Sequence, residues 1–184
     1  MIPYLFQENA LSAEDCDMLV RLAGAAEMAD AGLVGKTTAH GIRRADLVWL
    51  DDLPEAAPAM DRLIRLVADV NRDAFDVDLT EFAESAQIAR YTAEREGHFG
   101  WHSDIGRGGD LAIKRKLTLV IQLSDPGDYD GGGLELRPDA NAQIAPRTRG
   151  SAALFPSYVL HRVAPVTRGT RWSLTLWAHG PAYR

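Results

Sequence analysis

The second half of the chain is a succession of short segments rich in Ile, Leu, Val, Thr and aromatic residues, separated by Gly, Pro and Asp. This pattern begins at Glu84 and is typical of β-strands joined by turns. The expected strands are 86–92 (AQIARYT), 116–124 (KLTLVIQLS), 133–137 (GLELR), 151–156 (SAALFP) and 171–179 (RWSLTLWAH). Closely spaced strands of this kind predict a β-sandwich or an open barrel, and they disfavour a doubly wound sheet.

Two helices are expected before these strands. Ser12 is a suitable N-cap for the first helix, and Glu14 and Asp15 follow in its first turn, where negative charge complements the positive helix end. The second helix is expected from about Ala57 to Phe75, because apolar residues recur there at helical spacing. Residues 30–46 contain three glycines and no sustained period, which predicts a loop, and a short edge strand is expected at 46–50.

These elements predict a mainly β protein with supporting helices. We expect one domain over residues 1–184, with a helical support region at 1–83 and a β core at 84–184. A chain of this length can bury about 70% of the surface that its unfolded form exposes, which is enough for one compact core.

Two of the expected strands have one apolar and one more polar face, because successive side chains of a strand point in opposite directions. The apolar faces carry Leu117, Leu119, Ile121 and Leu123 in one strand, and Trp172, Leu174 and Leu176 in the other. The opposite faces carry Thr118, Val120 and Gln122, and Arg171, Ser173 and Thr175. This alternation fits a sheet with one face in water, and it equally fits a sheet whose polar face lines a pocket.

Composition limits the classes of function. The chain is 46% hydrophobic and 25% charged, as in an ordinary globular protein, and its formal net charge of −6 disfavours a nucleic-acid partner. Cys16 is the only cysteine, which excludes an internal disulfide and a cysteine-based zinc site, and we expect it to be buried packing. No apolar run approaches the ~20 residues that cross a bilayer, and the N-terminus lacks a signal-peptide pattern. We therefore expect no membrane partner and a cytoplasmic location.

Residues 98–106 (HFGWHSDIG) place two imidazoles and a carboxylate within seven positions. His102 and Asp104 are two residues apart, so on an extended backbone both side chains project to the same side. Imidazole and carboxylate groups are ligands that divalent iron, manganese and zinc accept. His161, at the end of an apolar stretch, is the candidate third ligand. Two imidazoles and one carboxylate leave metal positions open, as in non-haem Fe(II) oxygenases, although a loop without function would also contain such residues.

The remaining histidines are expected outside this site. His98 is expected near the ligands or at the surface, because the glycines that flank it disfavour a helical zinc-binding arrangement with the next histidine. His40 and His179 are expected to face solvent. Phe99 and Trp101 are expected to be packing residues.

Three blocks of the sequence, in order, resemble a known family. They are 87–104 (QIARYTAEREGHFGWHSD), 115–136 (RKLTLVIQLSDPGDYDGGGLEL) and 155–177 (FPSYVLHRVAPVTRGTRWSLTLW). These blocks are similar to the Fe(II)- and 2-oxoglutarate-dependent dioxygenases, specifically the prolyl-4-hydroxylase-like branch with the PKHD-type hydroxylases. The similarity extends from about residue 84 almost to the C-terminus, and the N-terminal helices resemble the support helices of small members.

This resemblance implies a double-stranded β-helix, or jelly roll, flanked by N-terminal α-helices. It implies that His102, Asp104 and His161 hold Fe(II), and that Arg171 binds the distal carboxylate of 2-oxoglutarate through two parallel charge-assisted hydrogen bonds. Arg168 is the competing candidate for that role, but it falls in a turn.

Two further residues are expected near the cosubstrate. Tyr91 aligns with a family tyrosine close to 2-oxoglutarate, whose phenol can donate to a carboxylate; the alternative is a core tyrosine with a satisfied hydroxyl. Gln122 departs from the family pattern, because some relatives have a tyrosine there that helps to bind the distal carboxylate, and an amide donor can substitute for it. The glycines of 128–136 (DYDGGGLEL) suit a tight turn between strands, and we expect them to be structural.

The resemblance also implies the reaction. We expect a hydroxylase that uses O2, and L-ascorbate as a further cofactor, to act on an unactivated C–H bond with release of succinate and CO2. The expected substrate is a peptidyl or free amino acid, with proline as one option, and the loop containing Arg43 and Arg44 is a candidate contact for it. Two alternatives stay open: a nucleobase-demethylating oxygenase, and a non-catalytic jelly-roll module that binds a metal or ligand. The sequence does not indicate an oligomeric state.

Overall fold

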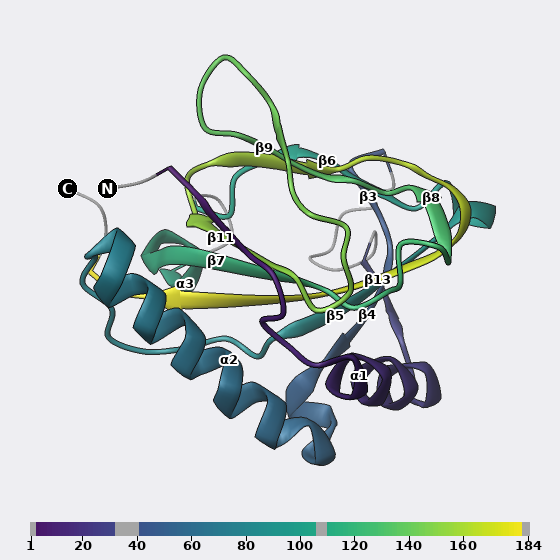
Figure 1. Ribbon diagram of the computed structural model, residues 1–184, viewed down its shortest axis with the longest axis horizontal. Helices are drawn as coiled ribbons and strands as arrows, with labels where there is room; N and C mark the ends of the chain where they lie inside the picture. The colour runs from purple at the N-terminus through teal and green to yellow at the C-terminus, as the bar shows by residue number, and fades with distance from the viewer. Residues whose placement is uncertain (1–2, 32–40, 106–109, 182–184) are drawn as a thin grey trace.

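The computed structural model describes residues 3–31, 41–105 and 110–181. Figure 1 shows two layers of strands with two long helices against one of them. The helices and strands, in chain order, are β1 (Leu5–Gln7), α1 (Ala13–Ala25), β2 (Ala29–Asp30), β3 (Arg43–Arg44), β4 (Asp46–Trp49), α2 (Ala57–Val70), β5 (Gln87–Thr92), β6 (His98–His102), α3 (Asp110–Lys114), β7 (Arg115–Gln122), β8 (Tyr129–Gly131), β9 (Leu134–Arg137), β10 (Gln143–Ile144), β11 (Ala152–Pro156), β12 (Leu160–Val163) and β13 (Val166–His179).

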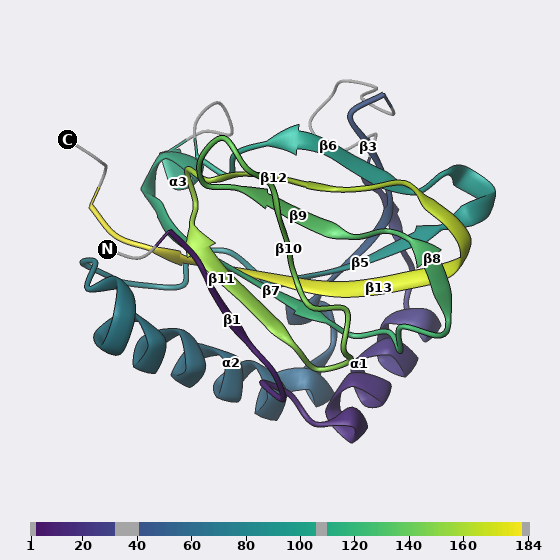
Figure 2. The ribbon, with the colours of Figure 1, turned by 45° about the horizontal axis from the view of Figure 1, so that its top comes forward.

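The strands form two sheets that stack on each other (Figure 2). The larger sheet has the order β1-β11-β7-β13-β5-β4-β2, with β8 paired to β13, and the smaller sheet has the order β10-β9-β12-β6-β3. Every strand pair found in the described residues is antiparallel. Because neighbours in these sheets are distant in sequence, β13 at the C-terminal end of the chain lies in the middle of the larger sheet, between β7 and β5.

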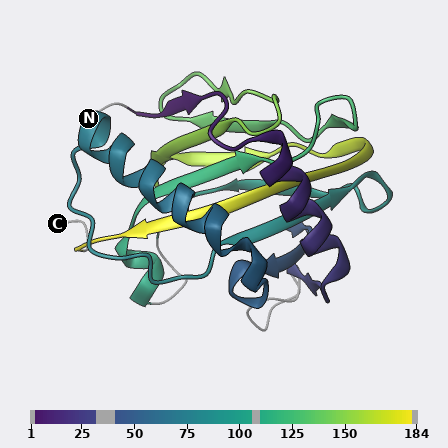
Figure 3. The ribbon, with the colours of Figure 1, turned by 60° about the horizontal axis from the view of Figure 1, so that its bottom comes forward.

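Helices α1 and α2 cover the outer face of the larger sheet (Figure 3). The Ser12 side chain accepts a hydrogen bond from the Asp15 backbone N–H at 3.1 Å, which confirms the expected N-cap of α1. Each helix buries one apolar stripe, with Cys16 and Leu19 in α1 and Leu63 in α2. These stripes pack with the apolar faces of β7 and β13 in one core cluster. Cys16 is fully buried and free, as predicted.

The second face of the larger sheet is also buried, because it faces the smaller sheet. A second core cluster fills this interior and includes Val120 from β7 and Leu136 from β9. Thr118 and Gln122, which alternate with the apolar residues of β7, also point into it and are buried. The polar faces of β7 and β13 therefore line the space between the sheets, and the interpretation with one face in water is wrong.

The N-terminal region contributes strands as well as helices. β1, β2 and β4 belong to the larger sheet, and β3 belongs to the smaller one. β4 confirms the strand expected at 46–50. It is not the edge strand of the sheet, because β2 pairs with its outer side and occupies the edge. Residues Arg43 and Arg44, predicted to be in a loop, pair with Phe99 and His98 of β6. The second α-helix ends at Val70, five residues before its predicted end at Phe75. The five residues from Asn71 to Phe75 continue it as one wide π-type turn.

In the part of the chain that the structure describes, none of the helices combines the length and apolar character needed to cross a bilayer.

Candidate metal centre and active site

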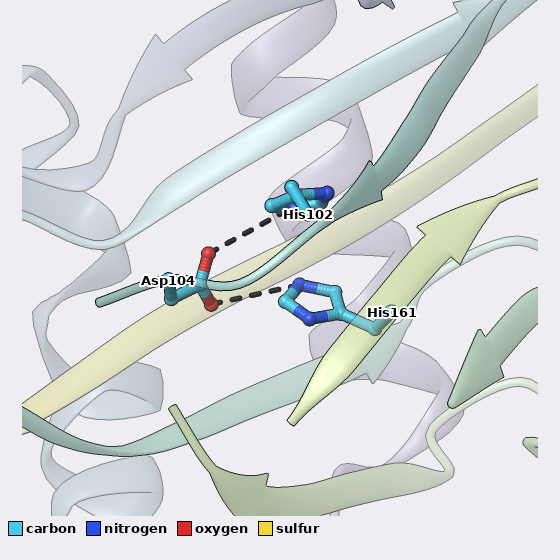
Figure 4. Close-up of side chains that lie close together, drawn as sticks. All are labelled: His102, Asp104 and His161. Atoms are coloured by element: carbon cyan, nitrogen blue, oxygen red, sulfur yellow. Dashed lines mark ion pairs between the residues drawn. The ribbon is translucent and has the colours of Figure 1, made fainter. Parts of the chain in front are cut away.

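Strands β6 and β12 of the smaller sheet bring His161 next to His102 and Asp104, which are distant from it in the sequence (Figure 4). His102 ends β6, Asp104 follows two residues later, and His161 in β12 pairs directly with His102. The Nε2 atom of His102 is 3.5 Å from Oδ1 of Asp104, and the Nε2 atom of His161 is 3.6 Å from Oδ2. The nitrogen and oxygen atoms that could bind a metal lie within 4.8 Å of one another. No other group of three such side chains is found in the described residues.

Backbone carbonyl groups orient both imidazole rings. The Nδ1 atom of His102 is 2.8 Å from the carbonyl oxygen of Gly100, and the Nδ1 atom of His161 is 3.0 Å from that of Val159. A carbonyl oxygen only accepts, so each Nδ1 carries the proton and donates it. Each Nε2 atom then presents its lone pair toward Asp104, which is the arrangement that metal-ligating histidines adopt.

The carboxylate of Asp104 is held by side chains from the larger sheet. Its Oδ2 atom accepts hydrogen bonds from the Thr118 hydroxyl at 2.7 Å and from the Trp177 indole N–H at 3.0 Å. The backbone N–H of Asp104 donates to the carbonyl oxygen of Ser157 at 2.8 Å. The residue is therefore fixed at its backbone and its side chain, although it lies beyond the end of a strand.

Burial and neighbouring groups act on the pKa values of this site. Burial alone would raise the pKa of the Asp104 carboxyl, but the His161 and His102 rings and the Trp177 N–H lower it below its usual value. Burial lowers the pKa of His161, with a smaller opposing effect from Asp104. An ionised carboxylate and a neutral imidazole are the protonation states that bind divalent metal ions.

A second group of polar residues supports Asp104 and Trp177. Arg115 donates a hydrogen bond to the Asp104 carbonyl oxygen at 3.2 Å, and its guanidinium carbon lies 4.1 Å from the centre of the Trp177 ring. The same guanidinium forms a two-pronged ion pair with Glu84, whose carboxylate also lies 2.8 Å from Nε2 of His179. Burial acts to raise the pKa of Glu84, but the hydrogen bonds and charges of Arg115 and His179 lower it overall.

The prediction that His179 faces solvent is wrong. Its side chain has no exposed surface, because β13 continues to pair with β7 up to this residue. Its Nδ1 atom accepts a hydrogen bond from the backbone N–H of Ala83 at 3.3 Å. His40 lies outside the described residues.

Arg171 is a cation buried in the interior. It is 2% exposed, donates from Nε to the Gln122 side-chain oxygen at 3.1 Å and from Nη1 to the Ser173 hydroxyl at 3.2 Å. No ion pair with a carboxylate is found for it among the described residues, and burial lowers the pKa of its guanidinium. A buried charge without a counter-charge is costly. The interior therefore has a site prepared for an anion.

One glycine makes room for this arginine. Gly132 has φ of +62°, and a Cβ atom there would lie 3.0 Å from Cδ of Arg171 and 2.9 Å from a methyl group of Val166. The turn residue thus combines a backbone conformation that favours glycine with close packing on the arginine side chain. This agrees with the structural role expected for the glycines of 128–136.

Tyr91 and Gln122 lie close to Arg171 in the interior. Tyr91 is 3% exposed, its ring centre is 5.6 Å from the guanidinium carbon, and it lines the same cavity as His102, Asp104 and His161. The Gln122 amide donates to the Tyr129 hydroxyl at 2.9 Å and accepts from Arg171, so it links these two side chains. Arg168, the competing arginine, is at the surface in a two-pronged ion pair with Asp130.

The aromatic residues next to the metal-ligand candidates differ in their positions. Phe99 stacks on His102, with ring centres 3.5 Å apart, and it also lines the cavity. Trp101 is 37% exposed, and the guanidinium carbons of Arg137 and Arg162 lie 5.2 Å and 4.9 Å from the centre of its ring. His98 is half-buried at the start of β6, and its Nδ1 atom is 2.7 Å from the Glu96 carbonyl oxygen.

Sequence reasoning missed Trp177, Thr118 and Arg115 as partners of Asp104. The alternation in β7 places Thr118 on the polar face, and continuing the alternation in β13 by one residue places Trp177 on the same face as Thr175. This signal was present in the sequence. Arg115 has no comparable signal, because it precedes the alternating segment.

A family model of the 2OG-Fe(II) oxygenase superfamily matches residues 86–179, a span that contains His102, Asp104, His161 and Arg171. The chain belongs to this superfamily. Membership implies Fe(II), 2-oxoglutarate and O2 as the reaction components, and the two imidazoles and one carboxylate fit an iron site.

Curated relatives include PKHD-type hydroxylases. One from Xanthomonas axonopodis pv. citri is 37% identical over 86 residues, which cover 44% of this chain and 38% of the relative. The match thus spans well under half of the relative's length. This agrees with the branch that the three sequence blocks resemble.

Solved structures confirm the jelly-roll fold. A prolyl-4-hydroxylase from Pseudomonas putida aligns with a TM-score of 0.77 and 23% identity, over 98% of this chain and 94% of that one. A prolyl hydroxylase from Trichoplax adhaerens, solved with a peptide fragment of hypoxia inducible factor, aligns with a TM-score of 0.77 and 18% identity, over 96% of this chain and 83% of that one.

Proposed function

We propose that this protein is an Fe(II)- and 2-oxoglutarate-dependent dioxygenase that hydroxylates an unactivated C–H bond of an amino-acid substrate, with release of succinate and CO2. The observation that carries the proposal is Arg171, a buried guanidinium with no carboxylate partner among the described residues, in the same interior as a His-Asp-His group. A metal-binding module without this cosubstrate would have no need for an unpaired buried cation. The cost of burying such a charge is offset when a dianionic ligand binds.

In this proposal, Nε2 of His102, Nε2 of His161 and a carboxylate oxygen of Asp104 bind the iron. Both rings are already held in the required tautomer by backbone carbonyl oxygens. Thr118 and Trp177 hold one oxygen of Asp104, which leaves its Oδ1 atom, the one nearer His102, without a hydrogen bond among the described residues. Oδ1 is therefore the natural donor to the metal.

Arg171 binds the distal carboxylate of 2-oxoglutarate in this proposal. Its Nε donates to Gln122 and its Nη1 donates one proton to Ser173, so the remaining N–H groups of the two Nη atoms are the donors for a carboxylate. Gln122 thereby orients the arginine, and Tyr91 forms part of the cavity wall between the arginine and the histidines. In this proposal both residues act on the cosubstrate, Tyr91 as the resemblance implies and Gln122 as an amide in the place of the tyrosine of some relatives.

When bound, the iron and 2-oxoglutarate supply the oxidising chemistry, and the protein supplies orientation and protection. Val120, Leu134 and Val163 line the cavity beside the ligand candidates and limit access of water to it. Thr118 and Trp177 keep the Asp104 carboxylate in place, and Arg115 holds its backbone carbonyl group. The residues of this chain therefore fix the ligands and exclude solvent.

The substrate class is supported by the names of similar proteins. PKHD-type hydroxylases and prolyl hydroxylases, one of them solved with a peptide fragment, suggest an amino acid or a peptide, with proline as an option. The net charge of −6 supports the expectation that nucleic acid is not the substrate. A role for ascorbate and a cytoplasmic location stay predictions.

The test is to measure metal and cosubstrate binding separately from turnover. Titration calorimetry with Mn(II), followed by 2-oxoglutarate, is expected to give one site for each, and Fe(II) with ascorbate is expected to give succinate from 2-oxoglutarate. The Asp104→Ala variant lacks a proposed metal ligand. Its metal affinity is expected to fall by more than the roughly 10- to 100-fold that follows from removing a hydrogen-bond partner of a ligand. Stoichiometric metal binding and normal turnover in that variant would falsify the assigned triad.

Metal binding by the wild type without any 2-oxoglutarate binding would favour the non-catalytic module. A salt-dependent gel shift of single-stranded DNA would favour the nucleobase-demethylating alternative.

A further inference from the structure

A second arginine lies at the active-site cavity. Arg43 in β3 pairs with Phe99 in β6, and both residues line the cavity that contains His102, Asp104 and His161. The guanidinium carbon of Arg43 lies 4.5 Å from the centre of the Phe99 ring, and that ring stacks on His102. The positive charge and a metal-ligand candidate therefore both contact the same aromatic ring.

This guanidinium has no polar partner in the described residues. Its Nε atom is buried and makes no hydrogen bond, and no ion pair is found for the side chain. The next residue is different, because Arg44 is bonded to Glu96 at 3.0 Å. Arg90 in β5 is likewise paired, with Asp46 at 2.7 Å.

The missing counter-charge cannot be an acidic side chain from the rest of the protein. Residues 1–2, 32–40, 106–109 and 182–184, which the structure does not describe, contain no aspartate or glutamate. All acidic side chains of the chain are therefore in the described part, and none of them pairs with Arg43. A buried N–H donor without an acceptor is unfavourable, and a cation in a cavity attracts an anion. No carboxylate side chain of this chain therefore serves as the counter-charge of Arg43, and an anionic ligand can take that place.

2-Oxoglutarate is not that group, if it binds where we propose. Arg171 lines a neighbouring cavity with Gln122 and Tyr129, whereas Arg43 lines the cavity of the metal-ligand candidates. The two cavities share Val120 and Leu134, so one 2-oxoglutarate molecule can extend from the metal-ligand candidates to Arg171. Its distal carboxylate is assigned to Arg171, and its other carboxylate would be held at the metal. Neither carboxylate is then left for Arg43, which remains for the substrate.

We propose that Arg43 binds a carboxylate of the substrate, so that the substrate is a small carboxylic acid, such as a free amino acid, and not an internal residue of a peptide chain. This inference rests on the proposed function. A peptide carbonyl group would accept a hydrogen bond but would leave the positive charge uncompensated, whereas a carboxylate satisfies both the donors and the charge. Because Arg43 and His102 contact the same Phe99 ring and line the same cavity, the carbon that is hydroxylated lies only a few bonds from this carboxylate.

The experiment uses the full chain loaded with Mn(II) and 2-oxoglutarate, which does not require turnover. The probes are the twenty free L-amino acids, the corresponding amino-acid amides, and the N-acetyl methylamides, which mimic internal peptide residues. Binding is measured by the relaxation that the paramagnetic Mn(II) causes in the NMR signals of each probe. At least one free acid is expected to bind near the metal, with its amide weaker by roughly 10- to 100-fold, the usual effect of one charge-assisted hydrogen-bonded contact.

Variants separate this role from a structural one. Arg43→Gln is expected to remove the difference between acid and amide, Arg43→Lys to keep part of it, and Arg44→Gln, on the other side of the same strand, to keep all of it. All three variants are expected to bind 2-oxoglutarate like the wild type, which also reports that they are folded. The inference is overturned if no acid binds, if the N-acetyl methylamides bind as tightly as the acids, or if Arg43→Gln retains the preference. Failure of the wild type to bind Mn(II) or 2-oxoglutarate would instead contradict the proposed function.

Discussion

Replacement of Arg171 by methionine separates the cost of a buried cation from its benefit in ligand binding. In the wild type the guanidinium donates to two neutral acceptors, on Gln122 and Ser173, and the part of the chain that the structure describes offers it no carboxylate partner. The variant leaves these acceptors without a donor, at a cost of about 1–3 kcal/mol, but it also removes an unpaired buried charge, whose burial costs several kcal/mol. Because the two effects oppose each other, we expect the unfolding free energy without 2-oxoglutarate to change by less than about 2 kcal/mol.

The effect on 2-oxoglutarate binding is expected to be much larger. Cutting one partner from a buried charge pair costs about 2–5 kcal/mol. A cost of about 2.7 kcal/mol, in the lower half of that range, raises the dissociation constant by about 100-fold. Wild-type protein with Mn(II) and 2-oxoglutarate at 100 times its dissociation constant is stabilised by about 2.7 kcal/mol. For a protein of this size that corresponds to an increase in melting temperature of about 5–11 °C. At the same concentration the variant gains only about 0.4 kcal/mol, or about 1–2 °C.

Thermal unfolding with and without 2-oxoglutarate measures both quantities in one assay. Arg168→Met is the matched control, because that arginine is at the surface in an ion pair with Asp130. It is expected to keep the full increase in melting temperature. An Arg171→Met protein that is stabilised by 2-oxoglutarate as much as the wild type would refute the assignment, and loss of the effect in Arg168→Met alone would transfer the role to that residue.

Three further predictions concern the support of the site and the core. Trp177→Phe removes the hydrogen bond to the Asp104 carboxylate and is expected to weaken Mn(II) binding by about 10- to 100-fold in calorimetry, whereas an unchanged affinity would show that this contact does not hold the ligand. Glu84 has a folded-state pKa below its unfolded value of about 4.3, so the unfolded state binds more protons in this range and stability falls as pH decreases below that value. Glu84→Gln is therefore expected to lose less stability between pH 5 and 3 than the wild type, as measured by urea unfolding, and an equal loss would contradict this. Burial raises the pKa of the Cys16 thiol to about 11, so a thiol reagent at pH 8 is expected to react fully only after denaturation, and rapid reaction of the native protein would contradict the packing role.

The fold was predictable where residue pattern determines structure locally. The alternation in 116–124 and 171–179 identified both faces of β7 and β13, and the capping residue Ser12 identified the start of α1. The pattern did not show which polar face is buried, because that depends on the second sheet, whose strands come from distant parts of the chain.

The position of β3 could not be predicted for the same reason. Its two residues have no strand pattern of their own, and they are in a strand only because they pair with β6, more than 50 residues later. This pairing is also what brings Arg43 to the cavity. Such a contact depends on tertiary structure and leaves little trace in the local sequence.

The candidate metal ligands were predictable because their chemistry and spacing are distinctive. His102 and Asp104 are two residues apart, and the order of the three family-like blocks indicated His161. His179 was assigned wrongly, because a histidine near the end of the chain has no local feature that reveals a buried partner. Its burial follows from Glu84 and Arg115, which reach it from other strands and loops.

The most direct measurement is a crystal structure of the protein with Mn(II) and N-oxalylglycine, an unreactive analogue of 2-oxoglutarate. We expect Mn(II) bound by Nε2 of His102, Nε2 of His161 and a carboxylate oxygen of Asp104. We also expect the far carboxylate of the analogue on the Nη groups of Arg171. A metal ion bound elsewhere, or an analogue whose carboxylate does not contact Arg171, would contradict the proposed site.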